Sequence, residues 1–110
     1  MDDDALDAAF AALANPTRRA ILARLATGPA GVSELAEPFE MSLPAVSKHI
    51  RVLEEAGLIE RSRRAQFRPC ELKPGPLAAV AHWTDGYRHI WDDRFDVMAR
   101  HLQDMKGKQT

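Results

Sequence analysis

Apolar residues recur at helical spacing in the middle of the chain, at Val46, Ile50 and Leu53. This spacing gives one narrow apolar stripe and predicts a short amphipathic helix. Ser42 is a favourable N-cap, and Pro44 stands in the first turn, where its missing N–H costs nothing. Gly57 stands where a left-handed residue is expected after a helix. The pattern therefore predicts one helix with an N-cap at its start and a glycine at its end.

The opposite face of this helix is polar and carries Ser47, Lys48 and Arg51. A short helix with an apolar back and a small, hydroxylated and cationic front suits the DNA major groove. An ordinary amphipathic surface helix would show the same pattern, so the flanking elements have to decide between the two interpretations.

Two helices are predicted at the start of the chain. The first covers residues 4–14, and its larger apolar side chains share one side at i, i+4 and i+7 spacing. These side chains are Leu6, Phe10 and Leu13. Asn15 followed by Pro16 ends this helix and begins the second, which reaches Ala26, with Asn15 as its cap.

A very short third helix is predicted over residues 33–39, with Leu35 directed to the core and Pro38 limiting its length. A few residues later the Ser42-capped helix begins. Two short helices joined by a tight turn, the second with a polar front, form a helix-turn-helix over residues 32–57.

The hydrophobic period changes after Gly57. Residues 58–62 and 67–72 are two strand candidates, and together they predict a hairpin, or wing, over residues 58–72. Pro69 favours an exposed edge position for the second strand. Arg63 and Arg64 lie at the tip of this wing, where we expect them to approach phosphate or the minor groove. A charge cluster that only keeps the hairpin soluble is the alternative.

The last predicted helix covers residues 76–105 and carries a long aromatic and aliphatic stripe. A winged domain of this size cannot cover the whole stripe, and an exposed apolar surface usually marks a partner. A second copy that packs the first and last helices is the simplest partner. The predicted dimer interface consists of Leu6, Phe10, Val80, Trp83, Tyr87, Trp91, Met98 and Leu102. Trp83, Tyr87 and Trp91 could instead line a small-molecule cavity between subunits.

Composition supports one folded domain over residues 1–110, because 45% of the residues are hydrophobic. No apolar run approaches the length of a membrane span, and the acidic N-terminus does not resemble a secretion signal. Cys70 is the only cysteine, so a reducing cytoplasm is the expected setting. The net charge is −1, but basic residues gather in the middle of the chain while the first helix is acidic.

The chain resembles the ArsR type of winged helix-turn-helix transcriptional regulators, closely over about residues 5 to 72. The matching segments are Leu13 to Leu22 (LANPTRRAIL), Val32 to Ala36 (VSELA) and Ser47 to Ile59 (SKHIRVLEEAGLI). The last of these is the most specific. The resemblance implies a mostly helical fold with a small hairpin wing. It also implies a homodimeric repressor that binds double-stranded DNA at its own or a neighbouring promoter, associated with the nucleoid.

The chain departs from the family's pattern at two places. The family's thiolate metal site places a Cys-x-Cys pair in the third helix, where this chain has Ala36-Glu37-Pro38, so it resembles a subgroup that lacks this site. The family has Gln or Ser early in the recognition helix, where this chain has Leu43-Pro44-Ala45. These side chains can touch thymine methyl groups but cannot donate to base edges.

The candidate DNA contacts come from the Ser42-capped helix and the wing tip. Lys48 and Arg51 are expected to reach phosphates, and Ser47 a base edge or a phosphate. His49 lies beside the apolar stripe, and a hydrogen bond within the domain or to one phosphate is favoured over base readout. The complete set is Ser42, Leu43, Pro44, Ser47, Lys48, His49, Arg51, Arg63 and Arg64.

We expect no metal site and no cofactor, and the sequence identifies no small-molecule or metal effector. His82, Asp85 and His89 are weak metal candidates, because their spacing would place them near one face of the last helix. An aromatic dimer helix with incidental polar neighbours is the favoured interpretation. Cys70 could sense oxidation, but no second cysteine could resolve it, so a buried inert thiol is favoured.

These features predict a dimeric, sequence-specific regulator, acting as a repressor. The alternative is a winged-helix protein-interaction module that does not bind DNA. We expect no enzyme, because the sequence shows no nucleophile beside a base, no glycine-rich phosphate loop and no carboxylate pair in a plausible cleft.

Overall fold

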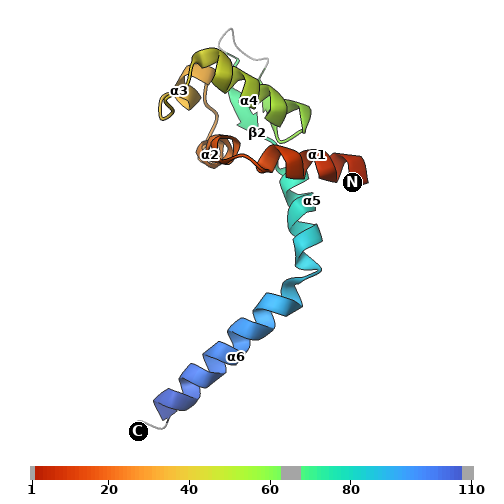
Figure 1. Ribbon diagram of the computed structural model, residues 1–110, viewed down its shortest axis with the longest axis vertical. Helices are drawn as coiled ribbons and strands as arrows, with labels where there is room; N and C mark the ends of the chain where they lie inside the picture. Colours follow the sequence, from red (N-terminus) through yellow and green to blue (C-terminus); the bar gives the residue numbers. More distant parts are fainter. Residues whose placement is uncertain (1, 63–67, 108–110) are drawn as a thin grey trace. The chain divides into compact units, whose positions relative to one another are not determined.

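The computed structural model describes residues 2–62 and 68–107 (Figure 1). The elements are α1 (Asp3–Leu13), α2 (Pro16–Leu25), α3 (Val32–Ala36), α4 (Leu43–Glu55), β1 (Ile59–Arg61), β2 (Cys70–Leu72), α5 (Pro74–Asp85) and α6 (Arg88–Gly107). They group into two compact units, Met1–Val80 and Ala81–Thr110. The first unit is mostly helical with one small antiparallel hairpin, which confirms the predicted fold class.

The predicted helix caps are present. The Ser42 Oγ accepts a hydrogen bond from the Ala45 backbone N–H at 3.3 Å, and the Asn15 Oδ1 accepts one from the Arg18 N–H at 3.1 Å. Gly57 follows α4 with a φ of 76°, a left-handed conformation that glycine adopts without a Cβ clash. These local interactions fix where α2 and α4 begin and where α4 ends.

The core of the first unit lies between α2, α3, α4 and the hairpin, which Figure 1 shows gathered together. Its largest fully buried side chains are Ile21, Leu35, Val46, Ile50, Leu53, Leu58, Ile59 and Cys70. The three predicted stripe residues of α4 are all 0% exposed. Because the back of α4 is completely buried, its polar residues are held on the outer side of the unit.

Helix α1 approaches the core with its smallest side chains. Ala9 and Ala12 are buried, whereas Leu6 and Phe10 are only half-buried. The alanine methyl groups allow the α1 backbone to lie close to its neighbours. The larger apolar side chains of α1 therefore remain partly accessible in a single copy.

The hairpin is shorter than predicted, and its pairing corrects the position assigned to Pro69. Strands β1 and β2 are antiparallel, with Arg61 paired to Cys70. Cys70 also exchanges two backbone hydrogen bonds with Ala30, at 3.1 and 2.8 Å, so β2 is flanked on both sides at this residue. Pro69 precedes the strand, and its missing N–H therefore interrupts neither pairing.

The predicted single helix over residues 76–105 is wrong in its continuity, because two helices, α5 and α6, occupy this stretch. Gly86 and Tyr87 separate them, and their N–H groups bond to carbonyls only three residues back, those of Trp83 and Thr84. Glycine disfavours the helical backbone, which allows the break at this point. The first residues of α5 belong to the first unit, and its end belongs to the second.

Candidate nucleic-acid interface

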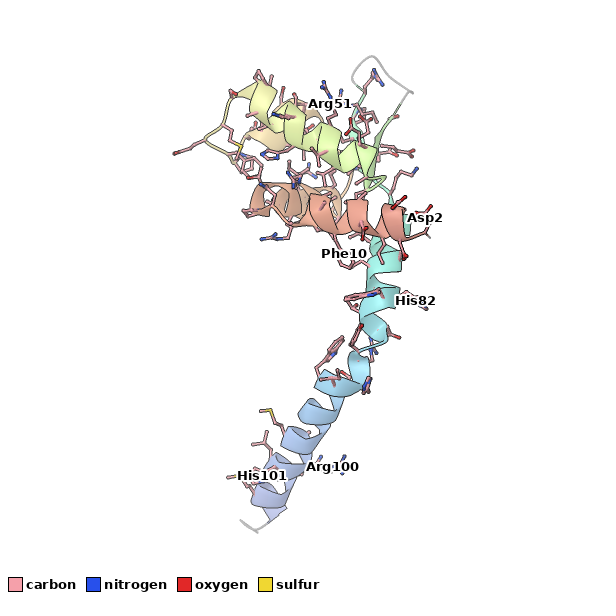
Figure 2. The ribbon with its side chains drawn as sticks, turned by 45° about the vertical axis from the view of Figure 1, so that its right-hand side comes forward. Asp2, Phe10, Arg51, His82, Arg100 and His101 are labelled. Carbon is pink, nitrogen blue, oxygen red and sulfur yellow. The ribbon has the colours of Figure 1, made fainter. Side chains whose placement is uncertain are left out.

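The outer face of α4 carries most of the predicted DNA contacts. Lys48 and Arg51 are exposed and Ser47 is half-exposed. Figure 2 shows Arg51 on the side of α4 that faces away from α1 and α2. Helical periodicity alone separates this face from the buried back of the same helix. The arrangement offers a hydroxyl group and two cations that do not contribute to the core.

The N-terminal turn of α4 is exposed and apolar apart from its cap. Leu43 is 50% exposed, and Ser42 and Pro44 are also exposed. Leu43 thus presents half of an apolar side chain to solvent at the start of the helix. Apolar contact with a thymine methyl group is the interaction that such a side chain can offer in the major groove.

His49 lies on the inner side of this surface and contacts another element. Its Nδ1 is 3.3 Å from the Arg18 Nη1. The same guanidinium group donates to two carbonyls at the end of α1, those of Ala12 at 2.7 Å and Ala11 at 3.0 Å. The contact therefore ties α4 to the junction of α1 and α2, as expected for a hydrogen bond within the domain.

The structure adds two arginines that sequence reasoning did not assign to the site. Arg61 in β1 and Arg68 before β2 line a pocket of about 230 Å³ together with Ser47, Arg51 and Glu54 of α4. The sequence had placed Arg61 and Arg68 only within a basic stretch of the chain. The pairing of β1 with β2 brings them together, and the sequence carries no signal that fixes this pairing register.

Arg68 has an unusual backbone conformation beside this pocket. Its φ is 45°, and it is the one non-glycine residue with positive φ in the described ranges 2–62 and 68–107. Such a conformation costs about 1–3 kcal/mol for a residue with a Cβ, and it is often found at functional sites. Arg63 and Arg64, the predicted wing-tip contacts, lie outside the described residues, so their roles stay predictions.

Cys70 is fully buried next to Arg61. Burial raises the pKa of its thiol, and the nearby Arg61 charge opposes this effect only in part. A thiol with a raised pKa is mostly protonated near neutral pH and is therefore a poor nucleophile. This environment agrees with the inert thiol rather than the oxidation sensor.

We therefore expect Cys70 to resist thiol reagents. Because its folded-state pKa lies above its unfolded value, the neutral thiol stabilises the fold at lower pH, and this contribution is lost as pH rises through the folded pKa. At pH 8, labelling by an aromatic disulfide should be on the order of a hundredfold slower than in the denatured chain. A Cys70→Val variant should lose less stability than the original chain above about pH 9. Rapid labelling of the folded chain would contradict this account.

The weak metal candidates on the last predicted helix are separated by its break. His82 and Asp85 belong to α5 and His89 to α6. The Asp85 carboxylate is an ion-pair partner of Arg88, at 2.8 Å from its Nε. Within the part of the chain that the structure describes, no three His, Cys, Asp or Glu side chains are grouped to hold a metal ion.

The second unit exposes the aromatic side chains that the sequence assigned to a dimer. Trp83 and Tyr87 form a tilted ring pair with centroids 5.1 Å apart. Trp83, Tyr87 and Trp91 are each between 40% and 47% exposed, and Met98 and Leu102 are more exposed still. Val80 is half-buried at the end of the first unit. None of the described helices is both long enough and apolar enough to cross a membrane.

Comparisons with known proteins agree with this geometry. A family model described as a helix-turn-helix domain matches residues 13–62. The HTH-type transcriptional regulator Rv2034 of Mycobacterium tuberculosis is 42% identical over 98 residues, which cover 82% of this chain and 92% of that protein. The transcriptional repressor SdpR of Bacillus subtilis is 35% identical over 74 residues, 67% of this chain and 82% of that protein.

A solved structure is similar to most of the chain. The crystal structure of an ArsR family transcriptional regulator has 45% sequence identity and a TM-score of 0.72. The match covers 80% of this chain and 97% of that structure. The fold, the matching sequence segments and the polar outer face of α4 therefore all agree with a helix-turn-helix transcriptional regulator.

Proposed function

The chain belongs to the ArsR family of winged helix-turn-helix DNA-binding transcriptional regulators, and from this premise we propose that it is a homodimeric repressor of a bacterial promoter. The observation that carries the proposal is the outer face of α4, where exposed cations stand on a helix whose opposite face is wholly buried. The family is not an enzyme class. A cytoplasmic, nucleoid-associated protein without a cofactor fits this role.

In the proposed complex α4 enters the major groove as the recognition helix. Lys48 and Arg51 neutralise phosphates, and Ser47 donates to a base edge or a phosphate. The exposed Leu43 and Pro44 contact thymine methyl groups. His49, Ser42 at the helix start, and Arg63 and Arg64 in the wing complete the proposed contacts.

A second copy of the chain would cover the exposed apolar side chains of the second unit. Together these side chains form a large exposed apolar surface, and such a surface usually marks an interaction site. The half-buried Leu6 and Phe10 of α1 would join them in the interface. A two-fold dimer presents two recognition helices, so the proposed operator is a palindrome with half-sites spaced by helical turns.

The experiment that tests this function is a DNA-binding titration on the region upstream of the chain's own gene, at several salt concentrations. If about six to ten phosphates are neutralised, the affinity should fall on the order of a thousandfold or more between about 50 and 200 mM salt. A random duplex of equal length is the control, and it should bind more weakly with a similar salt slope. The absence of salt-sensitive binding to either duplex would favour a protein-interaction module instead.

The same titration is repeated with zinc and with a chelator. A metal-independent repressor should give the same affinity in both conditions. Release of the DNA by zinc would instead support a metal site that includes His82 and His89, formed in the dimer.

A further inference from the structure

The pocket between α4 and the wing adds two arginines, Arg61 and Arg68, to the predicted DNA contacts. We propose that Ser47, Arg51, Arg61 and Arg68 bind one backbone phosphate of the DNA at the base of the wing. This inference rests on the proposed function, and it assigns Arg61 and Arg68 a role as a fixed phosphate clamp that acts independently of the wing tip.

The pocket lies between two consecutive elements of the chain. Helix α4 contributes Ser47, Arg51 and Glu54, and the hairpin contributes Arg61 and Arg68. Its volume of about 230 Å³ exceeds that of a single phosphate group, which leaves room for the attached sugar oxygens or for water. A ligand in this pocket would therefore touch the recognition helix and the wing at the same time.

The charge of the pocket selects an anion. Among the described lining residues, three guanidinium groups, each +1, and the −1 carboxylate of Glu54 give a net charge of +2. In the part of the chain that the structure describes, none of the three arginines forms an ion pair. Glu54 therefore offsets only one of the three positive charges, and an incoming phosphate would supply further negative charge.

Arg61 is the half-buried arginine of the pocket. Its Nε is buried, and no hydrogen-bond partner is present for it among the described residues. A buried N–H without an acceptor is costly, so this side chain is not fully satisfied by the described residues around it. Because the Nε is buried against the hairpin, where Arg61 lies beside the Cys70 thiol on the paired strand, it is the terminal Nη groups of Arg61 that would donate to a phosphate oxygen in this pocket.

Two kinds of ligand share this chemistry, a phosphodiester of the DNA backbone and free inorganic phosphate. The DNA phosphodiester is favoured because Ser47 and Arg51 belong to the outer face of α4, the surface that the proposed function applies to DNA. A backbone phosphate held between the recognition helix and the wing would fix the depth of α4 in the groove. Such a contact carries no sequence information of its own.

The test uses full-length Arg61→Gln and Arg68→Gln variants in the salt titration of DNA binding. If each copy of a dimer loses one phosphate contact, the slope of log affinity against log salt should become less negative by about 1.8. The affinity should fall on the order of tenfold or more, and by the same factor for the operator and for a random duplex. Arg68 is exposed, so its variant should fold even if removal of the half-buried Arg61 disturbs the hairpin.

Two further variants serve as a control and as a test of the opposite effect. Lys73→Gln removes one positive charge next to the same hairpin, outside the pocket, where the lysine faces Glu60 at 3.9 Å, and it should leave the slope unchanged. Glu54→Gln removes the one negative charge of the pocket and should tighten DNA binding severalfold.

The outcomes separate the clamp from the proposed function. If the unmodified chain binds DNA with a salt-sensitive affinity but both arginine variants keep its slope, the clamp is wrong and the proposed function stands. If the unmodified chain does not bind DNA, the proposed function and the clamp fail together. If inorganic phosphate at constant ionic strength stabilises the unmodified chain at micromolar concentration, but not the Arg68→Gln variant, the pocket binds free phosphate and the DNA assignment is overturned.

Discussion

Replacement of Trp91 by alanine is expected to convert the proposed dimer into a monomer and to lower the operator affinity by a factor on the order of a hundred to ten thousand. Trp91 lies on α6 and is 40% exposed in a single copy, so much of its ring is available to a partner. Truncation of an aromatic side chain that is buried in an interface costs about 3–5 kcal/mol. The loss of dimerisation removes the linkage between two half-site contacts, which accounts for the large effect on affinity. Light scattering at several protein concentrations measures the first effect, and DNA titration measures the second.

The control for this prediction is Arg100→Ala on the same helix. Arg100 is exposed and charged, so its removal should leave both the dimer and the operator affinity unchanged within about threefold. Met98→Asp offers a second approach, because it places a charge among the exposed apolar side chains and should dissociate the dimer as Trp91→Ala does. A Trp91→Ala protein that remains a stable dimer would show that the apolar side chains of α6 do not hold the two copies together.

The features of the fold that could be predicted from the sequence are those that depend on neighbouring residues. The Ser42 and Asn15 caps and the left-handed Gly57 each satisfy a backbone requirement within a few residues, so their residue types identify them. The apolar spacing of α4 also predicted which of its faces is buried, because a helix repeats every 3.6 residues whatever it packs against.

The break between α5 and α6 could not be predicted from neighbouring residues. Gly86 weakens a helix by only about 1 kcal/mol, an amount that packing can overcome or reinforce. The apolar spacing continues through the break, from Trp83 to Tyr87 and Trp91, and this continuity made a single helix the simpler expectation. Hydrophobic periodicity thus identified the apolar surface correctly but did not locate the turn within it.

Some residues of the candidate site could be predicted from the sequence, and others could not. Lys48 and Arg51 were found because one helix presents them together, whereas Arg61 and Arg68 approach α4 only through the pairing of two strands. The residues between those strands give no turn signal such as Asn-Gly, so the register could not be read from the sequence. The sequence showed that basic residues gather in the middle of the chain. Only the structure showed that three of these arginines line one pocket.

Simultaneous replacement of Lys48 and Arg51 by alanine should nearly abolish operator binding while leaving the fold intact. In a dimer the double variant removes four cationic contacts, which should make the salt slope less negative by about 3.6 and lower the affinity on the order of a thousandfold. Both side chains are exposed on the outer face of α4, so the free energy of unfolding should change by less than about 0.5 kcal/mol. Denaturant unfolding and salt-dependent DNA titration measure the two effects separately.

The matched control comes from the opposite face of the same helix. Ile50 is 0% exposed, and Ile50→Val should lower the free energy of unfolding by about 0.5–1.5 kcal/mol without changing the affinity of the folded protein. The two substitutions thus predict opposite results on one helix: a loss of DNA binding without a loss of stability from the front, and a loss of stability without a loss of DNA binding from the back. If the double variant kept both its affinity and its salt slope, α4 would not be the recognition helix, and the cations on its outer face would serve only to keep the surface hydrated.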